Sequence, residues 1–344
     1  MSRSAVGTAP APHLTAGERP ADILRDAVAG TRASLYDAWL ADGPDGLDDV
    51  CRYALGASGK LLRPALLRLA ARAVGGDWHA VLPAALGTEF GHVASLVHDD
   101  VIDGDAVRRG RASVHAAYGV DRAIVAGDAL LFGLFGALAE CRTTGIPDAR
   151  IVGALAAVAA AGVDMCRGQL LEAGVTGDLD CSVETYLDVA RWKTGALFRG
   201  ACASGAILGG APPSLVDALA KYGEALGVAF QVRDDLLAYT STPVVTGKAA
   251  TSDLRNRRAT LPVLLAVAAC PRHRAAVECA FAAPTDAAFA RLLEVLHESG
   301  ALAAAARIAA DHATHAEAAL EALPLTASRV ALARVARAAV ERDR

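Results

Sequence analysis

The chain has 344 residues, of which 53% are hydrophobic, 5% aromatic and 21% charged, and its formal net charge is −4. Because no block of Lys or Arg stands out, the composition argues against nucleic acid as a partner. The dominance of Ala, Leu and Val, with few strand-like alternations, predicts an all-α fold. The seven scattered cysteines form no CxxC pair, which indicates free thiols in the cytoplasm and not disulfides or a zinc site.

Breaks in the helical periodicity divide the chain into helix-length segments without separating domains. Residues 1–20 are rich in Ala, Pro, Ser and Thr and are predicted to be disordered, whereas residues 21–344 are predicted to form one domain. The spacing predicts roughly ten to twelve helices, the first beginning near Pro20. Apolar stretches such as Ile151–Val163 are too short and too rich in Ala and Gly to span a bilayer, and the N-terminus lacks a secretory signal. The breaks fall near Gly43–Gly46, Gly75–Asp77, Gly145–Asp148, Thr176–Asp180, Gly209–Pro213 and Thr240–Thr251.

The first candidate site is a basic pair, Lys60 and Arg63, in the segment GKLLRP (59–64). Their spacing of three places both side chains on one face of a helix, where they would bind an anion. Ordinary surface charges at a helix start explain this segment equally well. The segment is not a P-loop, because the required glycine and Lys-Ser/Thr pattern is missing.

The second candidate site is an acidic cluster in the segment HVASLVHDDVID (92–103). Asp99 and Asp103 are four residues apart and share a helix face, while Asp100 lies to one side. An isolated cluster of this kind is more often a solvated helix end. Here the anion-binding pair Arg108–Arg109 follows closely, so we expect the carboxylates to bind Mg²⁺ and a phosphate group, since Mg²⁺ prefers hard oxygen ligands.

A second acidic pair, Asp234 and Asp235, lies on another apolar stretch, and two such clusters facing each other would hold a diphosphate between them through metal. Lone lysines are usually surface charges, but Lys193 and Lys248 lie beside predicted helix ends near these acidic segments. We therefore expect both to bind phosphate. Lys248 belongs to a segment, Tyr239–Thr251, whose Thr, Pro and Gly residues predict a mobile loop.

In this order, these segments resemble the trans-isoprenyl diphosphate synthase (polyprenyl synthetase) family, and geranylgeranyl diphosphate synthases in particular. The resemblance runs from about Gly56 to Pro262 and implies the isoprenoid synthase fold, an antiparallel helix bundle around a deep central cavity, as a homodimer. It implies an Mg²⁺-dependent condensation of an allylic prenyl diphosphate with isopentenyl diphosphate. Its markers are GKLLRP (59–64), HVASLVHDDVID (92–103), RRG (108–110), AGDALL (126–131), GQLLEA (168–173), KTGALF (193–198), FQVRDD (230–235), GK (247–248) and SDLRNRRATLP (252–262).

The resemblance also implies roles for individual residues. For Mg²⁺ the implied ligands are Asp99, Asp103 and Asp234, supported by Asp100 and Asp235. For the allylic diphosphate they are Arg108, Lys193, Gln231 and Lys248, and for isopentenyl diphosphate they are Lys60, Arg63, His92 and Arg109. Thr194 and Gln169 would line the reacting centre.

Two departures from the family pattern and the chain-length residues complete the expectations. Ala238 replaces the third acidic residue of the second motif, and Arg258 stands where many members carry Lys. We expect Ala94 and Ser95, just before Asp99, to leave an apolar tunnel open. The aromatic floor below would be Phe132 and Phe135, which suggests a C20 product or somewhat longer; these two phenylalanines are equally well explained as ordinary core residues.

Two other functions fit the same sequence. A class I terpene cyclase would use the same scaffold and acidic clusters, but it needs no second diphosphate site and would be expected to have more aromatic side chains. A non-catalytic regulatory subunit of a prenyl synthase would be expected to have lost its first acidic cluster, which is intact here.

Overall fold

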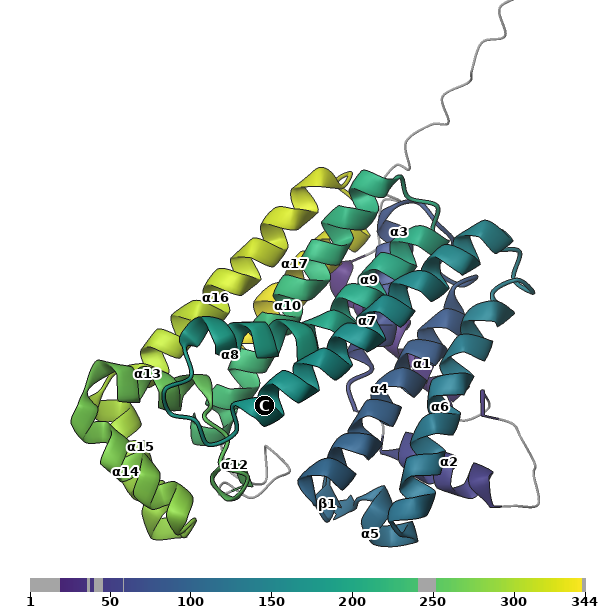
Figure 1. Cartoon of the computed structure of the whole chain (residues 1–344). Coiled ribbons are helices and arrows are strands. Elements are labelled where there is room, and N and C mark those ends of the chain that lie inside the picture. The colour runs from purple at the N-terminus through teal and green to yellow at the C-terminus, as the bar shows by residue number, and fades with distance from the viewer. Residues whose placement is uncertain (1–18, 36–37, 40–45, 58, 241–251, 342–344) are drawn as a thin grey trace, which may run out of the picture.

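The computed structural model describes residues 19–35, 38–39, 46–57, 59–240 and 252–341 and shows the all-α fold that the composition predicted (Figure 1). Long helices form a bundle, and the described strands are two short ones that pair as a hairpin. The elements are α1 (Pro20–Leu35), α2 (Leu47–Gly56), α3 (Leu62–Ala73), α4 (Leu82–Asp103), β1 (Val107–Arg108), β2 (Arg111–Ala112), α5 (Val114–Tyr118), α6 (Val120–Glu140), α7 (Asp148–Gly174), α8 (Val183–Val189), the π-helical turn η1 (Ala190–Gly195), α9 (Ala196–Leu208), α10 (Pro213–Thr240), α12 (Ser252–Arg255), α13 (Leu261–Ala269), α14 (Pro271–Ala282), α15 (Asp286–Glu298), α16 (Ala301–Ala319), the 3₁₀ turn η2 (Leu320–Ala322) and α17 (Ala327–Glu341).

Local sequence signals explain where the helices begin and end. Pro213 opens α10, and Ser182 caps α8 by accepting a hydrogen bond from the backbone N–H of Thr185. Gly104 ends α4 in the left-handed conformation, with φ 67°. The predicted breaks near Gly75–Asp77, Gly145–Asp148, Thr176–Asp180 and Gly209–Pro213 fall at junctions between observed helices, whereas residues 43–45 and 241–251 of the other two breaks lie outside the described residues. The described residues contain more helices than expected, because short ones such as α5 and α12 give no periodic signal.

The bundle is built around the long helices α4, α6, α7, α10 and α16. Helix α4 packs against α6, and α10 packs against α9 and α16, so that the first and second acidic segments lie on neighbouring parts of one bundle (Figure 1). One apolar core lies between α2, α4 and α6, and a second lies between α3, α9, α10 and α17. Helices α13, α14 and α15 form a smaller apolar cluster at one end of the molecule.

Glycines let several of these helices approach closely. A Cβ atom on Gly227 of α10 would lie 2.5 Å from the Cα of Gly195 in η1, and one on Gly223 would lie 2.5 Å from the carbonyl oxygen of Phe198. Both distances are too short for any real side chain, so α10 can pack against η1 and α9 only with glycine at these positions. This contact sets the distance between η1 and the second acidic segment.

Two of the helices are longer and more apolar than the sequence suggested. Helices α6 and α7 are both long and apolar enough to cross a membrane by length and composition alone. Ile151–Val163 was expected to be too short to span a bilayer, but it is part of α7, which has 27 residues and is long enough. Both helices pack within the bundle, α6 on α4 and α7 on α9, so their apolar character belongs at least in part to the core.

Candidate active site

Asp99 and Asp103 lie on the last two turns of α4 and share one face of it, as their spacing predicted. The Nζ atom of Lys193 lies 3.1 Å from Oδ1 of Asp99, and the guanidinium of Arg258 donates to Asp103. Burial raises the pKa of Asp99, but the positive charges of Lys193 and Arg258 lower it by more. The pKa of Asp99 is therefore below its ordinary value. At Asp103 burial outweighs the nearby charges, and the pKa is raised.

Lys193 and its neighbour Thr194 join the two acidic segments. Lys193 contacts Asp99 of the first segment and also donates to Glu172 of α7. The Thr194 hydroxyl donates to Oε1 of Gln231 on α10, at 2.8 Å. Consecutive residues of a helix point in different directions, so these two side chains reach different neighbours. Both lie in η1, a π-helical turn, which is a feature often found at functional sites.

A close contact between α7 and η1 fixes the position of Lys193. A Cβ atom on Gly168 of α7 would lie 2.3 Å from the backbone nitrogen of Lys193, so the two backbones touch. Glu172, one turn further along α7, thereby comes within hydrogen-bonding distance of the Lys193 ammonium. Gln169 is partly buried on the same helix.

Asp235 is buried, and its carboxylate is held by three protein donors. It accepts hydrogen bonds from the Tyr186 hydroxyl at 2.6 Å, from Nε2 of Gln231 at 3.0 Å and from the backbone N–H of Leu261 at 3.4 Å. Burial raises the pKa of Asp235 to about 7, although the hydrogen bonds oppose the shift. The carboxylate thus holds the Gln231 side chain, and its supporting role in metal binding stays a prediction.

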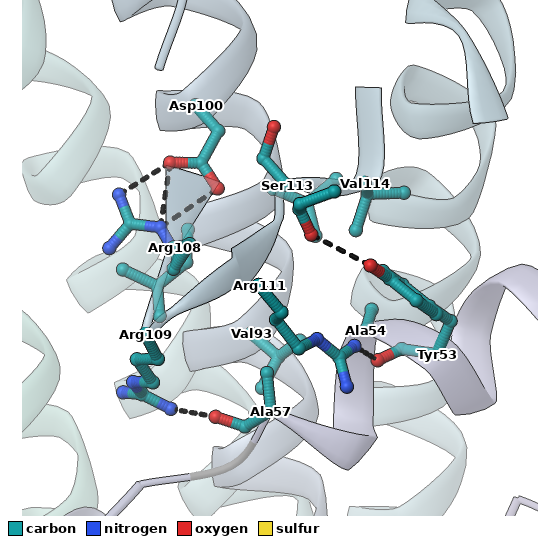
Figure 2. Close-up of a pocket in the computed structure, with 13 residues that line it drawn as sticks. Tyr53, Ala54, Ala57, Val93, Asp100, Arg108, Arg109, Arg111, Ser113 and Val114 are labelled. Atoms are coloured by element: carbon teal, nitrogen blue, oxygen red, sulfur yellow. Dashed lines mark hydrogen bonds and ion pairs between the residues drawn. The ribbon is translucent and has the colours of Figure 1, made fainter. Parts of the chain in front are cut away.

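Asp100 shows the same pattern in the first segment (Figure 2). Its carboxylate is buried and accepts from Arg108, with Nε–Oδ1 and Nε–Oδ2 distances of 2.6 and 2.8 Å. The supporting role of Asp100 in metal binding stays a prediction as well. Arg108 also lies 3.9 Å from Asp99, so Asp100 anchors this guanidinium beside the first acidic residue.

A second group of basic side chains lies about two turns before Asp99, on the same face of α4. Arg63 and His92 are both partly buried, and Nε of Arg63 and Nδ1 of His92 are buried atoms for which the described structure contains no hydrogen-bond partner. Burial lowers the pKa of Arg63 to about 10 despite the charge of Glu89. Burial, followed by the charges of Arg63 and Arg109, lowers the pKa of His92 well below its ordinary value. Buried polar atoms without partners indicate a place for a polar ligand.

Arg109 completes this basic group, and Lys60 lies at its edge. The Arg109 guanidinium donates to the carbonyl oxygen of Ala57 and lies against Gly59, where a Cβ atom would be 2.8 Å from it. The glycine of the GKLLRP segment therefore leaves room for an arginine from a distant part of the chain. Lys60 itself is exposed. Lys248 lies outside the described residues, so its predicted role stays a prediction.

The acidic residues that remain fit a divalent metal in a particular way. Among the described residues no three His, Cys, Asp or Glu side chains form a ready-made metal cage. Mg²⁺ needs no such cage, since it is typically bound by one or two carboxylates together with phosphate oxygens and water. Asp99 and Asp103 share a face of α4, and Asp234 is exposed on α10 with its charge acting on Arg63. This set fits an Mg²⁺ ion that binds together with a diphosphate.

The chain-length residues agree only in part with expectation. Ala94 is buried, and Ser95 is partly buried with its hydroxyl bonded to the carbonyl of His92. The predicted floor at Phe132 is wrong within one chain, because this side chain is 75% exposed. Helix α6 instead places the buried Leu134 against α4, where a Cβ on Gly91 would lie 3.1 Å from it. Phe135 is 38% exposed and stays a prediction.

Several site residues gave no interpretable signal in the sequence. Tyr186 has no short spacing to an acidic or basic motif, and only the fold brings it to the site. Glu172 lies within the segment GQLLEA (168–173) and Glu89 three residues before His92, but neither was predicted as a site residue, since their partners lie on other helices. Arg258 was noted as a departure from the family, but its pairing with Asp103 could not be inferred. Ala238, the other departure, packs against the apolar cluster of α13–α15, a poor environment for the missing carboxylate.

Comparison with known proteins agrees with this fold. Residues 44–296 match the polyprenyl synthetase family. The chain is 35% identical over 301 residues to a short chain isoprenyl diphosphate synthase of Methanothermobacter thermautotrophicus, covering 87% of this chain and 91% of the relative. It is 35% identical over 243 residues to a geranylgeranyl diphosphate synthase of Methanosarcina mazei, covering 71% and 74%. A crystal structure of polyprenyl synthase from Caulobacter crescentus complexed with calcium and isoprenyl diphosphate superposes with a TM-score of 0.86 at 34% identity, covering 95% and 98%.

The fold and site thus define an all-α enzyme of the isoprenoid synthase fold. The chain belongs to the polyprenyl synthetase family. It is a trans-prenyl diphosphate synthase, a prenyltransferase of isoprenoid biosynthesis that condenses isopentenyl diphosphate with a prenyl diphosphate. The family binds a divalent metal, and its members are soluble enzymes.

Proposed function

We propose that this enzyme uses Mg²⁺ to condense an allylic prenyl diphosphate with isopentenyl diphosphate, giving all-trans geranylgeranyl diphosphate. The observation that carries the proposal is the bridge made by Lys193 and Thr194, which joins Asp99 of the first acidic segment to Gln231 of the second. The basic group around Arg63 and His92 provides a second, separate anion site. A terpene cyclase would have no use for that second site.

Asp99, Asp103 and Asp234 are the proposed Mg²⁺ ligands. When bound, the metal would draw charge from the leaving diphosphate and so favour ionisation of the allylic C–O bond. In its absence Lys193 and Arg258 hold the carboxylates of Asp99 and Asp103. We expect both cations to exchange these partners for diphosphate oxygens, helped by Arg108 and Lys248. The calcium and isoprenyl diphosphate named for the Caulobacter crescentus structure support this assignment.

Thr194, Gln231 and Gln169 are proposed to surround the reacting carbon atoms. Because the Thr194 hydroxyl donates to Gln231, its oxygen keeps lone pairs that can face an allylic cation. The double bond of isopentenyl diphosphate, held by Lys60, Arg63, His92 and Arg109, would attack that cation. The released diphosphate would take the proton, and the apolar surroundings would exclude water.

A product of C20 is the proposed chain length. The small side chains of Ala94 and Ser95 leave room beside α4 just before the acidic cluster, whereas an aromatic side chain there would shorten the product. The likeness to the Methanosarcina mazei enzyme, named as a geranylgeranyl diphosphate synthase, supports the same length.

We further propose that the enzyme is a homodimer joined through α6 and α7. These helices pack on each other, and both expose large apolar side chains that a monomer would leave in water. Helix α6 contributes Phe132, Phe135, Ile124 and Val125, and α7 contributes Val152, Val163 and Leu170. A second copy of the chain, which presents the same apolar face, is the simplest partner for it.

Product sizing tests the proposed reaction. Purified enzyme is incubated with Mg²⁺, isopentenyl diphosphate and a C5, C10 or C15 primer in turn. We expect elongation with an end point at C20. A cyclic hydrocarbon formed from one primer without isopentenyl diphosphate would establish a cyclase instead, and a C15 end point would overturn the proposed length.

Asp99→Asn tests the proposed metal site. The amide removes the charge that the divalent ion needs, so we expect the rate of product formation to fall by about a thousandfold or more, about 4 kcal/mol in barrier. Asp121→Asn, which removes an exposed carboxylate in the first turn of α6, is the control and should leave the rate unchanged. A rate for Asp99→Asn within about tenfold of wild type would show that the metal is bound elsewhere.

A further inference from the structure

The hairpin that carries Arg108 and Arg109 is too small to hold its own shape. It pairs only Val107 with Ala112 and Arg108 with Arg111. The turn between the strands, Arg109-Gly110, has two positive φ angles, 52° and 77°, as in a type I′ turn. Arginine rarely adopts this conformation, and an isolated two-stranded hairpin is at best marginally stable. Contacts outside the hairpin must therefore keep Arg109 in position.

Tyr53 of α2 makes those contacts with both strand residues of β2 (Figure 2). The guanidinium carbon of Arg111 lies 3.8 Å from the centre of the Tyr53 ring, and Nη2 of Arg111 donates to the Tyr53 carbonyl oxygen. In the other direction, the Tyr53 hydroxyl donates to the carbonyl oxygen of Ala112 at 2.8 Å. The Tyr53 ring is itself held by Tyr118, edge to face with centres 5.1 Å apart.

The same helix also receives Arg109. Its guanidinium donates to the carbonyl oxygen of Ala57, four residues after Tyr53, just past the end of α2. Arg109 and Arg111 thus reach neighbouring turns of one segment, while Arg108 reaches back to Asp100 on α4. A shift of Arg111 along α2 would move Arg109, because only Gly110 separates them.

We propose that Tyr53 and Arg111 are positioning residues that hold Arg109 in place for isopentenyl diphosphate, an inference that rests on the proposed role of Arg109. Arg111 does not itself bind the diphosphate, since its guanidinium is occupied by the ring and the carbonyl of Tyr53. The allylic diphosphate is proposed to bind at Lys193 and the acidic residues, which the hairpin reaches, among the described residues, through Arg108, and Asp100 anchors this arginine separately. Loss of the Tyr53–Arg111 pair should therefore affect one substrate more than the other.

Steady-state kinetics with Arg111→Met, Tyr53→Phe and the double variant test this inference. We expect each single variant to raise KM for isopentenyl diphosphate by about fivefold, the effect of losing one hydrogen bond, with kcat and the allylic KM within about twofold of wild type. Because both residues act through one hairpin, the double variant should be no worse than the more impaired single variant. Tyr53→Phe keeps the ring and its packing, so it stays informative even if Arg111→Met lowers stability.

Arg72→Met is the matched control, because Arg72 also lies over an aromatic ring, that of Trp78, but at the far end of α3 from Arg63. It should change neither KM. Equal rises in both KM values, or no rise, would overturn the inference. Multiplied effects in the double variant would show instead that Arg111 binds the diphosphate directly. These outcomes differ from failure of the proposed function, which would appear as wild-type enzyme that does not consume isopentenyl diphosphate.

Discussion

At the scale of single residues, the acidic motifs contain two kinds of aspartate. Asp99 and Asp103 share one face of α4 and pair with the cations Lys193 and Arg258. A metal ion can take the place of these cations at the carboxylates. Asp100 and Asp235 point into the protein and hold Arg108 and Gln231. The sequence shows five similar carboxylates, including the exposed Asp234, but their neighbours differ, and the neighbours decide which oxygens are available. Charge spacing alone could not predict this division.

Tyr186→Phe tests the structural role of Asp235. The variant loses only the hydroxyl that donates to Asp235, at 2.6 Å, so the carboxylate and the Gln231 amide that it fixes are held less firmly. We expect kcat to fall about tenfold, about 1.4 kcal/mol, while both KM values stay within about twofold. Tyr222→Phe is the control: its hydroxyl donates to the buried carbonyl of Leu332, outside the site, so stability alone should change. An unchanged kcat in Tyr186→Phe would contradict this role.

His92→Gln tests the low pKa of this histidine. Burial and the nearby arginine charges keep His92 neutral in the folded protein, whereas the unfolded chain takes up a proton near its ordinary pKa of about 6.5. Stability from this group is therefore present above that pKa and is lost as pH falls, by at most about 1.4 kcal/mol per pH unit.

Thermal unfolding between pH 7.5 and 5.5 measures the effect. The fall in Tm with falling pH should be shallower for His92→Gln than for wild type. His79→Gln removes an exposed histidine outside the site and controls for the substitution itself. Identical slopes for His92→Gln and wild type would mean that folding does not lower the pKa of His92.

At the scale of elements, the site depends on places where helices touch through glycine. Gly168 brings α7 against η1, and Gly227 of α10 brings the second acidic segment against the same turn. Together they place Glu172 next to Lys193 and Gln231 next to Thr194. The sequence predicted both helices. It did not predict that these glycines lie at the helix contacts, because a glycine within a helix does not indicate which element packs against it.

Gly168→Ala tests this contact. A Cβ atom would lie 2.3 Å from the backbone nitrogen of Lys193, so α7 and η1 must separate. We expect a loss of stability of about 2 kcal/mol and a lower kcat, since Lys193 moves with its backbone. Gly162→Ala on the same helix meets open space and should instead stabilise the protein by about 1 kcal/mol. Denaturant unfolding and steady-state kinetics distinguish the two, and equal stability of both variants would rule out the close contact.

At the scale of the whole molecule, the apolar faces of α6 and α7 carry the proposed dimer. Phe132 and Leu170 are each 75% exposed in one chain, so replacing either should barely change the fold of that chain. In a two-fold dimer each of these side chains would be buried once in each copy, so its contribution to the free energy of association would be doubled. The size of this apolar surface explains why both helices also resemble membrane spans by length and composition.

Phe132→Ser is expected to weaken the dimer. Light scattering after size-exclusion chromatography should show a dimer for wild type and mainly monomer for the variant at micromolar concentration, because each interface loses two buried aromatic side chains, about 3 kcal/mol or more in total. Leu325→Ser removes a side chain that is 69% exposed between η2 and α17, away from this face, and should remain dimeric. Monomeric wild-type protein would contradict the interface.

The amino-acid sequence was enough to predict the helical fold, several breaks between the long helices and the motifs that carry the charged residues. These follow from periodicity, caps and spacing, which are local properties of the chain. Only the tertiary structure decided that Asp100 and Asp235 are held by protein donors, that Phe132 faces outward, and that Tyr53 and Tyr186 support the site. Each of these depends on which side chain lies opposite, and the packing of distant helices sets that partner. The local sequence pattern does not indicate which side chains will be partners.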